Sequence, residues 1–107
     1  MNNLLEESLK IFLQECKESV KQGKLDLIPR DKNMESIIKM GLTIFDIEDI
    51  ICSLTVKDYY RGPSEDYKYK DEYVWEFLKK YDEFRIYIKL KLNDDKTVCI
   101  SFHEAEY

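Results

Sequence analysis

The first part of the chain repeats its apolar residues every three or four positions, which is the spacing of an amphipathic helix. In the first segment the repeating residues are Leu5, Leu9, Phe12, Leu13, Cys16 and Val20. Glutamate and lysine residues occupy the other face of this segment. The pattern predicts a helix over about residues 4–22, which Gly23 would end.

Two shorter helices are predicted before residue 55. The second would be capped by Asp31 and closed by Gly41. Its apolar face consists of Met34, Ile37 and Ile38. Thr43 and Asp46 have the spacing of a capping box, which predicts the start of the third helix. The repeating apolar residues of that helix are Ile44, Ile47, Ile50, Ile51 and Leu54. The helical part therefore covers about residues 1–55.

From Val56 onward the apolar period changes from 3.6 residues to 2, which indicates strands. Three or four strands are predicted in this part, which covers about residues 56–107. They are Asp58–Arg61, Tyr73–Tyr81, Phe84–Leu92 and a last segment that contains Val98, Ile100 and Phe102. Gly62 and Pro63 would end the first strand, and a polar loop rich in tyrosine would follow to about Asp71.

The last two strands are predicted to form a hairpin around the turn at residues 93–95. The apolar face of the hairpin consists of Phe84, Ile86, Ile88, Leu90, Leu92, Val98, Ile100 and Phe102. Aligning these residues requires that the numbers of paired residues have an even sum. The two plausible even registers place His103 opposite Tyr87 or opposite Arg85. In both, the exposed face carries His103, Ser101, Tyr87, Arg85 and Lys89.

Composition places the chain among folded domains. It has 107 residues, of which 44% are hydrophobic and 36% are charged. Residues 1–107 are therefore expected to form a single α+β domain, with the helices packed on one face of a twisted, mainly antiparallel sheet. No apolar run approaches the roughly 18 residues that span a membrane, and the first residues lack the pattern of a signal peptide. We expect a cytoplasmic protein with no membrane partner.

Several classes of site are disfavoured by the residues present. Cys16, Cys52 and Cys99 lie far apart and the chain has one histidine, so neither a disulfide framework nor a metal site is expected. The chain contains no Walker loop, no GxGxxG and no GxSxG, which argues against a nucleotide cofactor. Its net charge of -5 argues against binding duplex nucleic acid regardless of sequence. We therefore expect no metal and no cofactor.

The polar face of the predicted hairpin combines side chains that can move protons and stabilise a pentacovalent phosphate without a metal ion. That chemistry is the cleavage of RNA by its own 2′-hydroxyl group. His103 and Tyr87 are candidates for the proton transfers, and Arg61 or Lys89 for the cation. Two alternatives stay open. The face could simply be solvated, as in many antiparallel sheets, and the strand aromatics could fill a core rather than stack on bases.

Six short blocks of sequence carry a resemblance to a known family. They are Met40–Leu42, Ile50–Leu54, Lys57–Arg61, Val74–Glu76, Arg85–Lys89 and Val98–Glu104. In order and spacing, over about residues 24–107, they resemble the MqsR family of toxins from bacterial toxin–antitoxin pairs, which share the RelE-like fold. The resemblance implies a metal-independent endoribonuclease that cuts messenger RNA. It also implies a partner antitoxin that neutralises the toxin.

The resemblance implies a set of site residues as well. The family's basic residue, glutamine, strand tyrosine and final lysine fall at Arg61, Glu76, Tyr87 and His103. Glu76 replaces a neutral amide with a carboxylate, which would serve as a base or repel RNA. His103 replaces a lysine with a group that titrates much closer to neutral pH. A third departure is the net charge of -5, because better-known members of the family are basic.

The resulting prediction is a toxin endoribonuclease with single-stranded RNA and a cognate antitoxin as partners. His103 and Glu76 would share the acid–base work. Arg61 and Lys89 would hold the scissile phosphate, while Tyr87 would orient the adjacent base. The predicted substrate-binding residues are Lys89, Arg85, Trp75 and Tyr60. The alternative is a non-catalytic protein-binding module that retains the RelE-like fold, which the carboxylate at Glu76 and the acidic charge balance favour.

Overall fold

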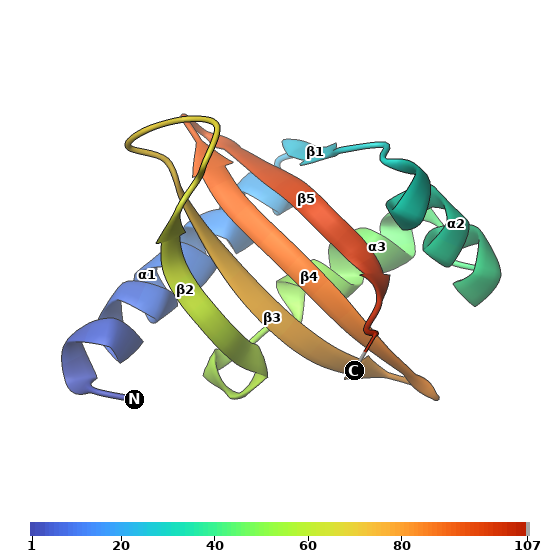
Figure 1. Ribbon diagram of the computed structural model, residues 1–107, viewed down its shortest axis with the longest axis horizontal. Coiled ribbons are helices and arrows are strands. Elements are labelled where there is room, and N and C mark those ends of the chain that lie inside the picture. The colour runs from blue at the N-terminus through green and yellow to red at the C-terminus, as the bar shows by residue number, and fades with distance from the viewer. Residues whose placement is uncertain (107) are drawn as a thin grey trace.

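A computed structural model describes residues 1–106 (Figure 1). Within these residues the chain forms three α-helices, a short 3-10 helix and one five-stranded sheet. The helices are α1 (Asn3–Lys21), α2 (Asp31–Met40), α3 (Ile44–Cys52) and the 3-10 helix η1 (Val56–Asp58). The strands are β1 (Leu25–Leu27), β2 (Tyr59–Glu65), β3 (Tyr73–Tyr81), β4 (Phe84–Asn93) and β5 (Lys96–Glu104). The predicted α+β class is confirmed.

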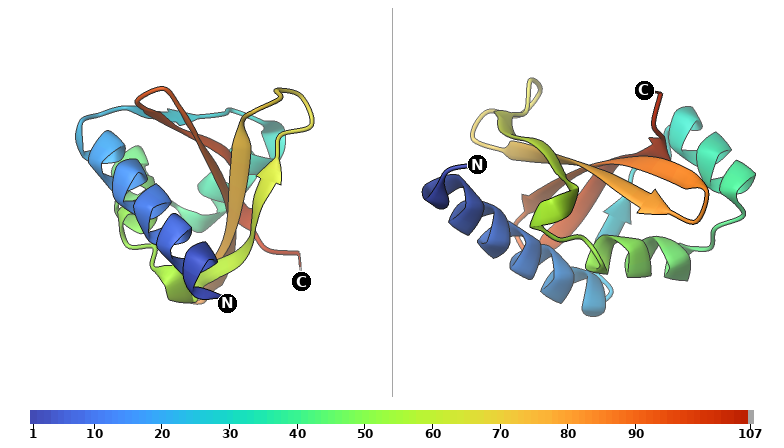
Figure 2. Two further views of the ribbon diagram at one scale, coloured as in Figure 1. Left: turned by 90° about the vertical axis from the view of Figure 1, so that its left-hand side faces the viewer. Right: turned by 90° about the horizontal axis from the view of Figure 1, so that it is seen from below.

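The strands follow the order β1-β5-β4-β3-β2, with β1 parallel to β5 and the other neighbours antiparallel. Figure 1 shows α1 and α3 behind the sheet, and the right-hand view of Figure 2 shows both helices on one side of it. Apolar residues of α1, α3 and the strands form the core between these two layers. The helices therefore cover one face of the sheet, as predicted, and leave the other face open.

The first and third helices begin where the sequence pattern places them. The side-chain oxygen of Asn2 accepts a hydrogen bond from the backbone N–H of Leu5 at 2.8 Å, which caps α1. Thr43 and Asp46 form both hydrogen bonds of the predicted capping box at the start of α3. The predicted apolar stripe of α1 is buried at Leu9, Phe12, Leu13, Cys16 and Val20.

The second helix differs from its prediction in two details. Asp31 is the first helical residue rather than the cap, and Arg30 at the cap position makes no capping hydrogen bond with its side chain. Of the predicted apolar face, Ile37 is buried, whereas Met34 is 38% and Ile38 76% exposed. The helix docks through Ile37 and through Asn33, whose buried amide bonds the backbone of β5. A polar anchor of this kind leaves no trace in an apolar pattern.

The first strand was not predicted at all. The sequence pattern assigns no element to residues 24–29, whereas Leu25–Leu27 pair with Thr97–Cys99 of β5. A strand of three residues is too short to display a period of two. This pairing adds a fifth strand at the edge of the sheet beyond β5.

The second strand continues through the residues that were predicted to end it. Gly62 and Pro63 lie within β2, joined by a cis peptide bond, and β2 extends to Glu65. Gly62 has a φ of 123°, and a Cβ there would lie 2.8 Å from the carbonyl oxygen of Val74. Only glycine fits this close approach to β3. The register of β2 shifts on both sides of Arg61, so the strand bends there instead of ending.

Near the end of β5 the predicted hairpin register is confirmed. Tyr87 lies opposite His103, which is one of the two even registers. The core face carries the fully buried residues Ile86, Ile88, Leu90 and Phe102. The sheet face that bears Tyr87 and His103 is consequently the one that the helices leave open.

Nearer the turn, a bulge in β5 overturns the predicted alternation. The pairing shifts by one residue, so that Leu90 lies opposite Cys99 rather than opposite Ile100. Cys99 is fully buried in the core. Val98 and Ile100, predicted for the core face, lie on the open face and line a pocket there. A bulge changes which residues face the core without changing their hydrophobicity, so the sequence pattern does not reveal it.

Candidate functional site

Four of the predicted site residues form a row across the open face of the sheet, one on each of four neighbouring strands. They are Arg61 on β2, Glu76 on β3, Tyr87 on β4 and His103 on β5. Strand pairing places Arg61 opposite Glu76, and Tyr87 opposite His103. We call these four residues the polar row.

Glu76 is the centre of the polar row. Its side chain is 7% exposed. Oε2 accepts a hydrogen bond from Nε of Arg61 at 2.9 Å, and Oε1 accepts a short one from the Tyr87 hydroxyl. A buried carboxylate is costly unless its oxygens are bonded, and here both are. Glu76 is therefore arranged to hold its two neighbours in position.

The Arg61 guanidinium is held by Glu76 and Tyr60 but remains accessible to solvent. Its side chain is 62% exposed, and its bond to Glu76 runs through Nε. The carbon of the guanidinium lies 5.1 Å from the centre of the Tyr60 ring. The hydrogen bond to Glu76 and the charge of that carboxylate raise the pKa of Arg61 above its ordinary value. The N–H groups at Nη1 and Nη2 can thus face an anion such as a phosphate.

Tyr87 and His103 form the other half of the polar row. Their ring centroids lie 5.2 Å apart with the planes tilted by 40°. Nδ1 of His103 lies 3.0 Å from the carbonyl oxygen of Glu104. Because a carbonyl oxygen can only accept, Nδ1 carries the proton, and Nε2 is the basic nitrogen of the neutral ring.

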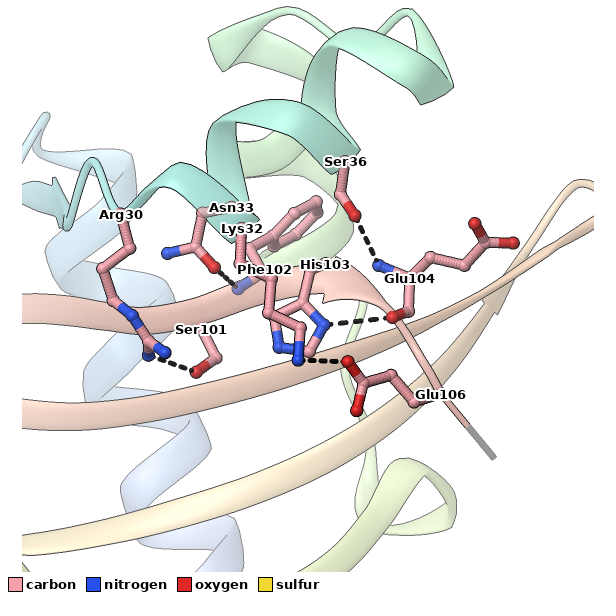
Figure 3. A network of polar contacts seen from close by, with 9 residues as sticks. All are labelled: Arg30, Lys32, Asn33, Ser36, Ser101, Phe102, His103, Glu104 and Glu106. Atoms are coloured by element: carbon pink, nitrogen blue, oxygen red, sulfur yellow. Dashed lines mark hydrogen bonds and ion pairs between the residues drawn. The ribbon is translucent and has the colours of Figure 1, made fainter.

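His103 is less accessible than strand alternation predicts. It is 7% exposed. Figure 3 shows Lys32 and Glu106 beside the imidazole, where they form an ion pair. This pair lowers the pKa of Glu106, mainly through the hydrogen bond and charge of Lys32 and in smaller part through the charge of His103. The segment that follows β5 therefore shelters this end of the polar row.

Three predicted substrate-binding residues surround the row at different places. Lys89 pairs with Glu76 in the sheet and is half-buried next to it. Tyr60 is 38% exposed and lies under the Arg61 guanidinium. Arg85 is exposed and lines a separate hollow between β2 and the β3–β4 turn. The structure thus brings Lys89 and Tyr60 to the row and leaves Arg85 at its margin.

Trp75 does not belong to this face. It is 5% exposed and lies in the core, on the side of the sheet that the helices cover. Its ring stacks on Phe12 of α1 at 5.4 Å and meets the edge of Tyr59 at 6.2 Å. The prediction that Trp75 contacts substrate is therefore wrong. Alternation along β3 puts Trp75 and Phe77 on one face and Glu76 on the other, which is the signal that was missed.

A pocket of about 350 Å³ opens beside the polar row. Its lining residues are Ile28, Ser64, Glu65, Asp66, Tyr67, Lys68, Tyr69, Val74, Glu76, Lys89, Lys91, Val98 and Ile100. Glu76 and Lys89 belong both to this lining and to the predicted site. Sequence reasoning missed the pocket because it forms only when the loop between β2 and β3 folds over the bulge in β5.

Lys91 ties this loop to the sheet. Its ammonium lies 2.9 Å from Asp66 and 2.8 Å from Glu72, and 4.6 Å from the centre of the Tyr69 ring. Burial lowers the pKa of Lys91, but the hydrogen bonds to Glu72 and Asp66 outweigh it and raise that pKa overall. The hydrogen bond from Lys91 lowers the pKa of Asp66. This cluster holds one ammonium against two carboxylates, so it adds no positive charge to the open face.

Among residues 1–106, no group of three or more His, Cys, Asp and Glu side chains is placed to hold a metal ion. Over the same residues, each helix is too short or too polar to cross a membrane.

Comparison with protein families gives a match over most of the chain. The matching family model is described as motility quorum-sensing regulator, toxin of MqsA, and it covers residues 10–104 of the 107-residue chain. No curated protein matches the chain. The matched range contains the whole polar row and the residues that line the pocket.

Proposed function

Since the chain belongs to the MqsR toxin family, and is thus a toxin of a toxin–antitoxin system with an antitoxin as its partner, we propose that it is a metal-independent endoribonuclease. Its three helices on a mostly antiparallel open sheet agree with the RelE-like fold. The proposed substrate is single-stranded RNA, cleaved through attack by its own 2′-hydroxyl group.

The polar row is the observation that supports this proposal. It combines an accessible guanidinium, a buried carboxylate, a phenol and an imidazole within one row of hydrogen bonds and ring contacts. Cleavage through the 2′-hydroxyl needs a base, an acid and a cation. The row offers the base and the cation, and Lys89, which pairs with Glu76 in the sheet, offers the acid. The sheet holds each side chain on a different strand, which gives the rigid placement that positioning requires.

The proposed reaction exchanges one bond at phosphorus for another. The 2′-oxygen bonds to phosphorus while its proton passes to Nε2 of His103. The bond from phosphorus to the 5′-oxygen breaks, and this oxygen takes a proton from the Lys89 ammonium. Arg61 binds the non-bridging oxygens as their charge increases. The products are a 2′,3′-cyclic phosphate and a 5′-hydroxyl end.

Glu76 has a different role in this scheme from the acid–base role that the sequence suggested. Both of its oxygens are bonded, one to Arg61 and one to Tyr87. We therefore assign it as a positioning residue, which fixes the guanidinium against the phosphate and the phenol against the adjacent nucleotide. Access of the 2′-hydroxyl to His103 requires the Lys32–Glu106 pair to open, because the imidazole is 7% exposed.

A non-catalytic protein-binding module is the second candidate. The Arg61–Glu76 pair favours it, because a carboxylate next to the guanidinium weakens its attraction for RNA phosphates. The net charge of -5 acts in the same direction. The two candidates differ in one observable, which is cleavage of RNA by the purified protein.

The test compares wild type with His103→Ala and Glu104→Ala on single-stranded RNA of mixed sequence at low salt. Glu104 is the matched control, because it is the next residue of β5 and its side chain pairs with Lys39 at 2.7 Å rather than with the polar row. We expect His103→Ala to lose about a hundredfold or more in cleavage rate while its circular dichroism spectrum stays that of the folded wild type. Glu104→Ala should stay within about twofold, as expected for a surface ion pair.

Two results would contradict the proposal in different ways. Wild-type cleavage that persists in His103→Ala would remove His103 from the mechanism. RNA that stays intact with wild type at high protein concentration would favour the protein-binding module.

A further inference from the structure

The pocket beside the polar row has an apolar floor on a face where no helix packs. The floor is formed by Val74 of β3 with Val98 and Ile100 of β5, and Ile28 joins it from the segment after β1. Val74 and Val98 are 4% and 7% exposed. The bulge in β5 is what turns Val98 and Ile100 toward this side. The pocket therefore depends on the same departure from regular strand geometry that places Cys99 in the main core.

The wall of the pocket is a loop held at both ends. Asp66 and Glu72 flank the loop tip, and Lys91 binds both carboxylates from the sheet below. The backbone N–H of Asp66 also donates to the carbonyl of Glu72 at 2.8 Å, which closes the base of the loop. Tyr69 lies over the Lys91 ammonium. With its base fixed in this way, the loop stands over the apolar floor and encloses a hollow large enough for a small planar ligand.

The mouth of the pocket adjoins the residues that would handle phosphate. Glu76 and Lys89 line the pocket, and Glu76 bonds both Arg61 and Tyr87. Among the cations lining the hollow, the Lys91 ammonium is paired with two carboxylates, whereas the Lys89 ammonium has no hydrogen bond or ion pair with another side chain of residues 1–106. An occupant would thus have an apolar face on the floor, an acceptor toward Lys89 and an anionic group toward Arg61.

A nucleotide has this distribution of chemistry. We propose that the pocket binds the nucleobase next to the scissile phosphate, with the ring face on Val74, Val98 and Ile100 and the 5′-oxygen of that phosphate toward the Lys89 ammonium. This inference rests on the proposed ribonuclease function and adds a base-binding site to it. Proteins that select positions in single-stranded RNA usually bind unstacked bases, by packing side chains on the ring faces and by hydrogen bonds to the base edges. A side chain of a protein partner would not need the adjacent phosphate-binding guanidinium.

The test measures binding separately from cleavage. The probe is a short RNA from the cleavage assay, made with 2′-O-methyl groups so that the nucleophile is blocked, together with copies that each lack one base. We expect removal of one particular base to weaken binding to wild type about tenfold or more, and removal of the others to matter less. This part uses the unmodified protein, so it does not depend on whether a variant folds.

Two variants test whether that base occupies the pocket. Ile100→Phe fills the floor and should weaken binding of the intact probe by the same factor, with no further loss when the sensitive base is absent. Ile38→Phe makes the same change at a residue of α2 that is 76% exposed, and it should bind like wild type.

The outcomes distinguish failure of the base-binding proposal from failure of the ribonuclease proposal. If Ile100→Phe and wild type bind every probe alike while wild type cleaves RNA, the pocket assignment is wrong and the proposed function stands. If the binding pattern is as expected but wild type cleaves no RNA, the pocket does bind a base and the proposed cleavage reaction is wrong. Loss of antitoxin binding in Ile100→Phe with RNA affinity intact would assign the pocket to the protein partner and overturn the inference.

Discussion

The two faces of the sheet are built from alternate residues of the same strands, yet they bury different chemistry. The face beneath α1 and α3 buries apolar side chains such as Phe77 and Ile88, both fully inaccessible. The open face also buries charged side chains, with Glu76 at 5% and Lys91 at 6% exposure, next to the apolar pocket floor of Val74 and Val98. Each of these charges is enclosed with groups of opposite charge.

This difference indicates that the covered face serves mainly stability and the open face mainly function. Apolar burial is the main source of folding free energy. A buried ion pair contributes little net stability compared with apolar residues of the same size. The polar burial on the open face is therefore poorly explained as stabilisation, and well explained as the placement of Arg61, Tyr87 and the loop around a substrate.

The largest effect is expected on the covered face. Phe77→Ala should lower the free energy of unfolding by about 3–5 kcal/mol, because it leaves a cavity between the sheet and the helices. Urea denaturation monitored by circular dichroism measures this loss. Ile38→Ala, at a residue 76% exposed, is the control and should change stability by less than about 0.5 kcal/mol. Equal losses in the two variants would contradict the assigned core.

Lys91→Met should be the most destabilising change on the open face. It keeps an apolar stem of similar length but leaves Asp66 and Glu72 without their cation in a poorly solvated site. We expect a loss of about 2 kcal/mol, between the values for exposed and buried pairs. Hydrogen exchange should rise selectively at residues 66–72. A loss spread evenly over the whole chain would show that Lys91 supports the fold rather than the loop.

The same cluster gives a pH dependence with a defined sign. The lowered pKa of Asp66 stabilises the fold fully above the ordinary aspartate value of about 3.9, and this contribution is lost as the pH falls through the folded-state pKa. The raised pKa of Lys91 stabilises the fold fully below about 10.4, and this contribution is lost as the pH rises through its folded-state value. The stability difference between wild type and Lys91→Met should therefore be largest between about pH 4 and pH 10 and shrink beyond both limits. A difference that grows below about pH 4 would have the wrong sign.

Glu76→Gln tests whether the carboxylate of the polar row positions its neighbours or repels RNA. The amide keeps the shape but removes a negative charge beside the substrate, so RNA affinity should rise by about fivefold at low salt. The cleavage rate at saturating RNA should fall, because Arg61 and Tyr87 lose the ionic acceptor that fixes them. Affinity and turnover are measured separately by anisotropy and single-turnover kinetics. A rise in both would remove the positioning role.

Lys89→Met should have the smallest effect on folding and a clear effect on RNA. Lys89 is half-buried and forms no ion pair with another residue of the described chain, so stability should change by less than about 0.5 kcal/mol. RNA affinity should fall, and the salt dependence of binding should weaken by roughly one counterion. Unchanged salt dependence would show that Lys89 does not face a phosphate.

Much of the fold was predictable because periodicity is a local property. The stripe of α1, the capping box at Thr43 and the pairing of Tyr87 with His103 all follow from residues close together in sequence or related by strand alternation. The three-residue strand β1 and the bulge at Ile100 do not, since each arises from pairing with a distant segment.

The candidate site was predictable in its members but not in its environment. The face shared by Arg61, Tyr87 and His103 followed from alternation and family resemblance. The burial of His103 depends on Lys32 and Glu106 meeting across it, and the pocket depends on a loop closing over a bulge. Such contacts join residues far apart in the chain, and no local pattern encodes them. The burial of Trp75, in contrast, could have been predicted from sequence. Alternation along β3 already places Trp75 and Glu76 on different faces of the sheet.

We propose that the open face cleaves RNA through the 2′-hydroxyl without a metal ion. The most direct measurement is to incubate wild type with single-stranded RNA in excess EDTA and to identify the chemical ends of the products. The account predicts cleavage that leaves 2′,3′-cyclic phosphate and 5′-hydroxyl ends. RNA that stays intact in EDTA, or products with 5′-phosphate ends, would contradict it.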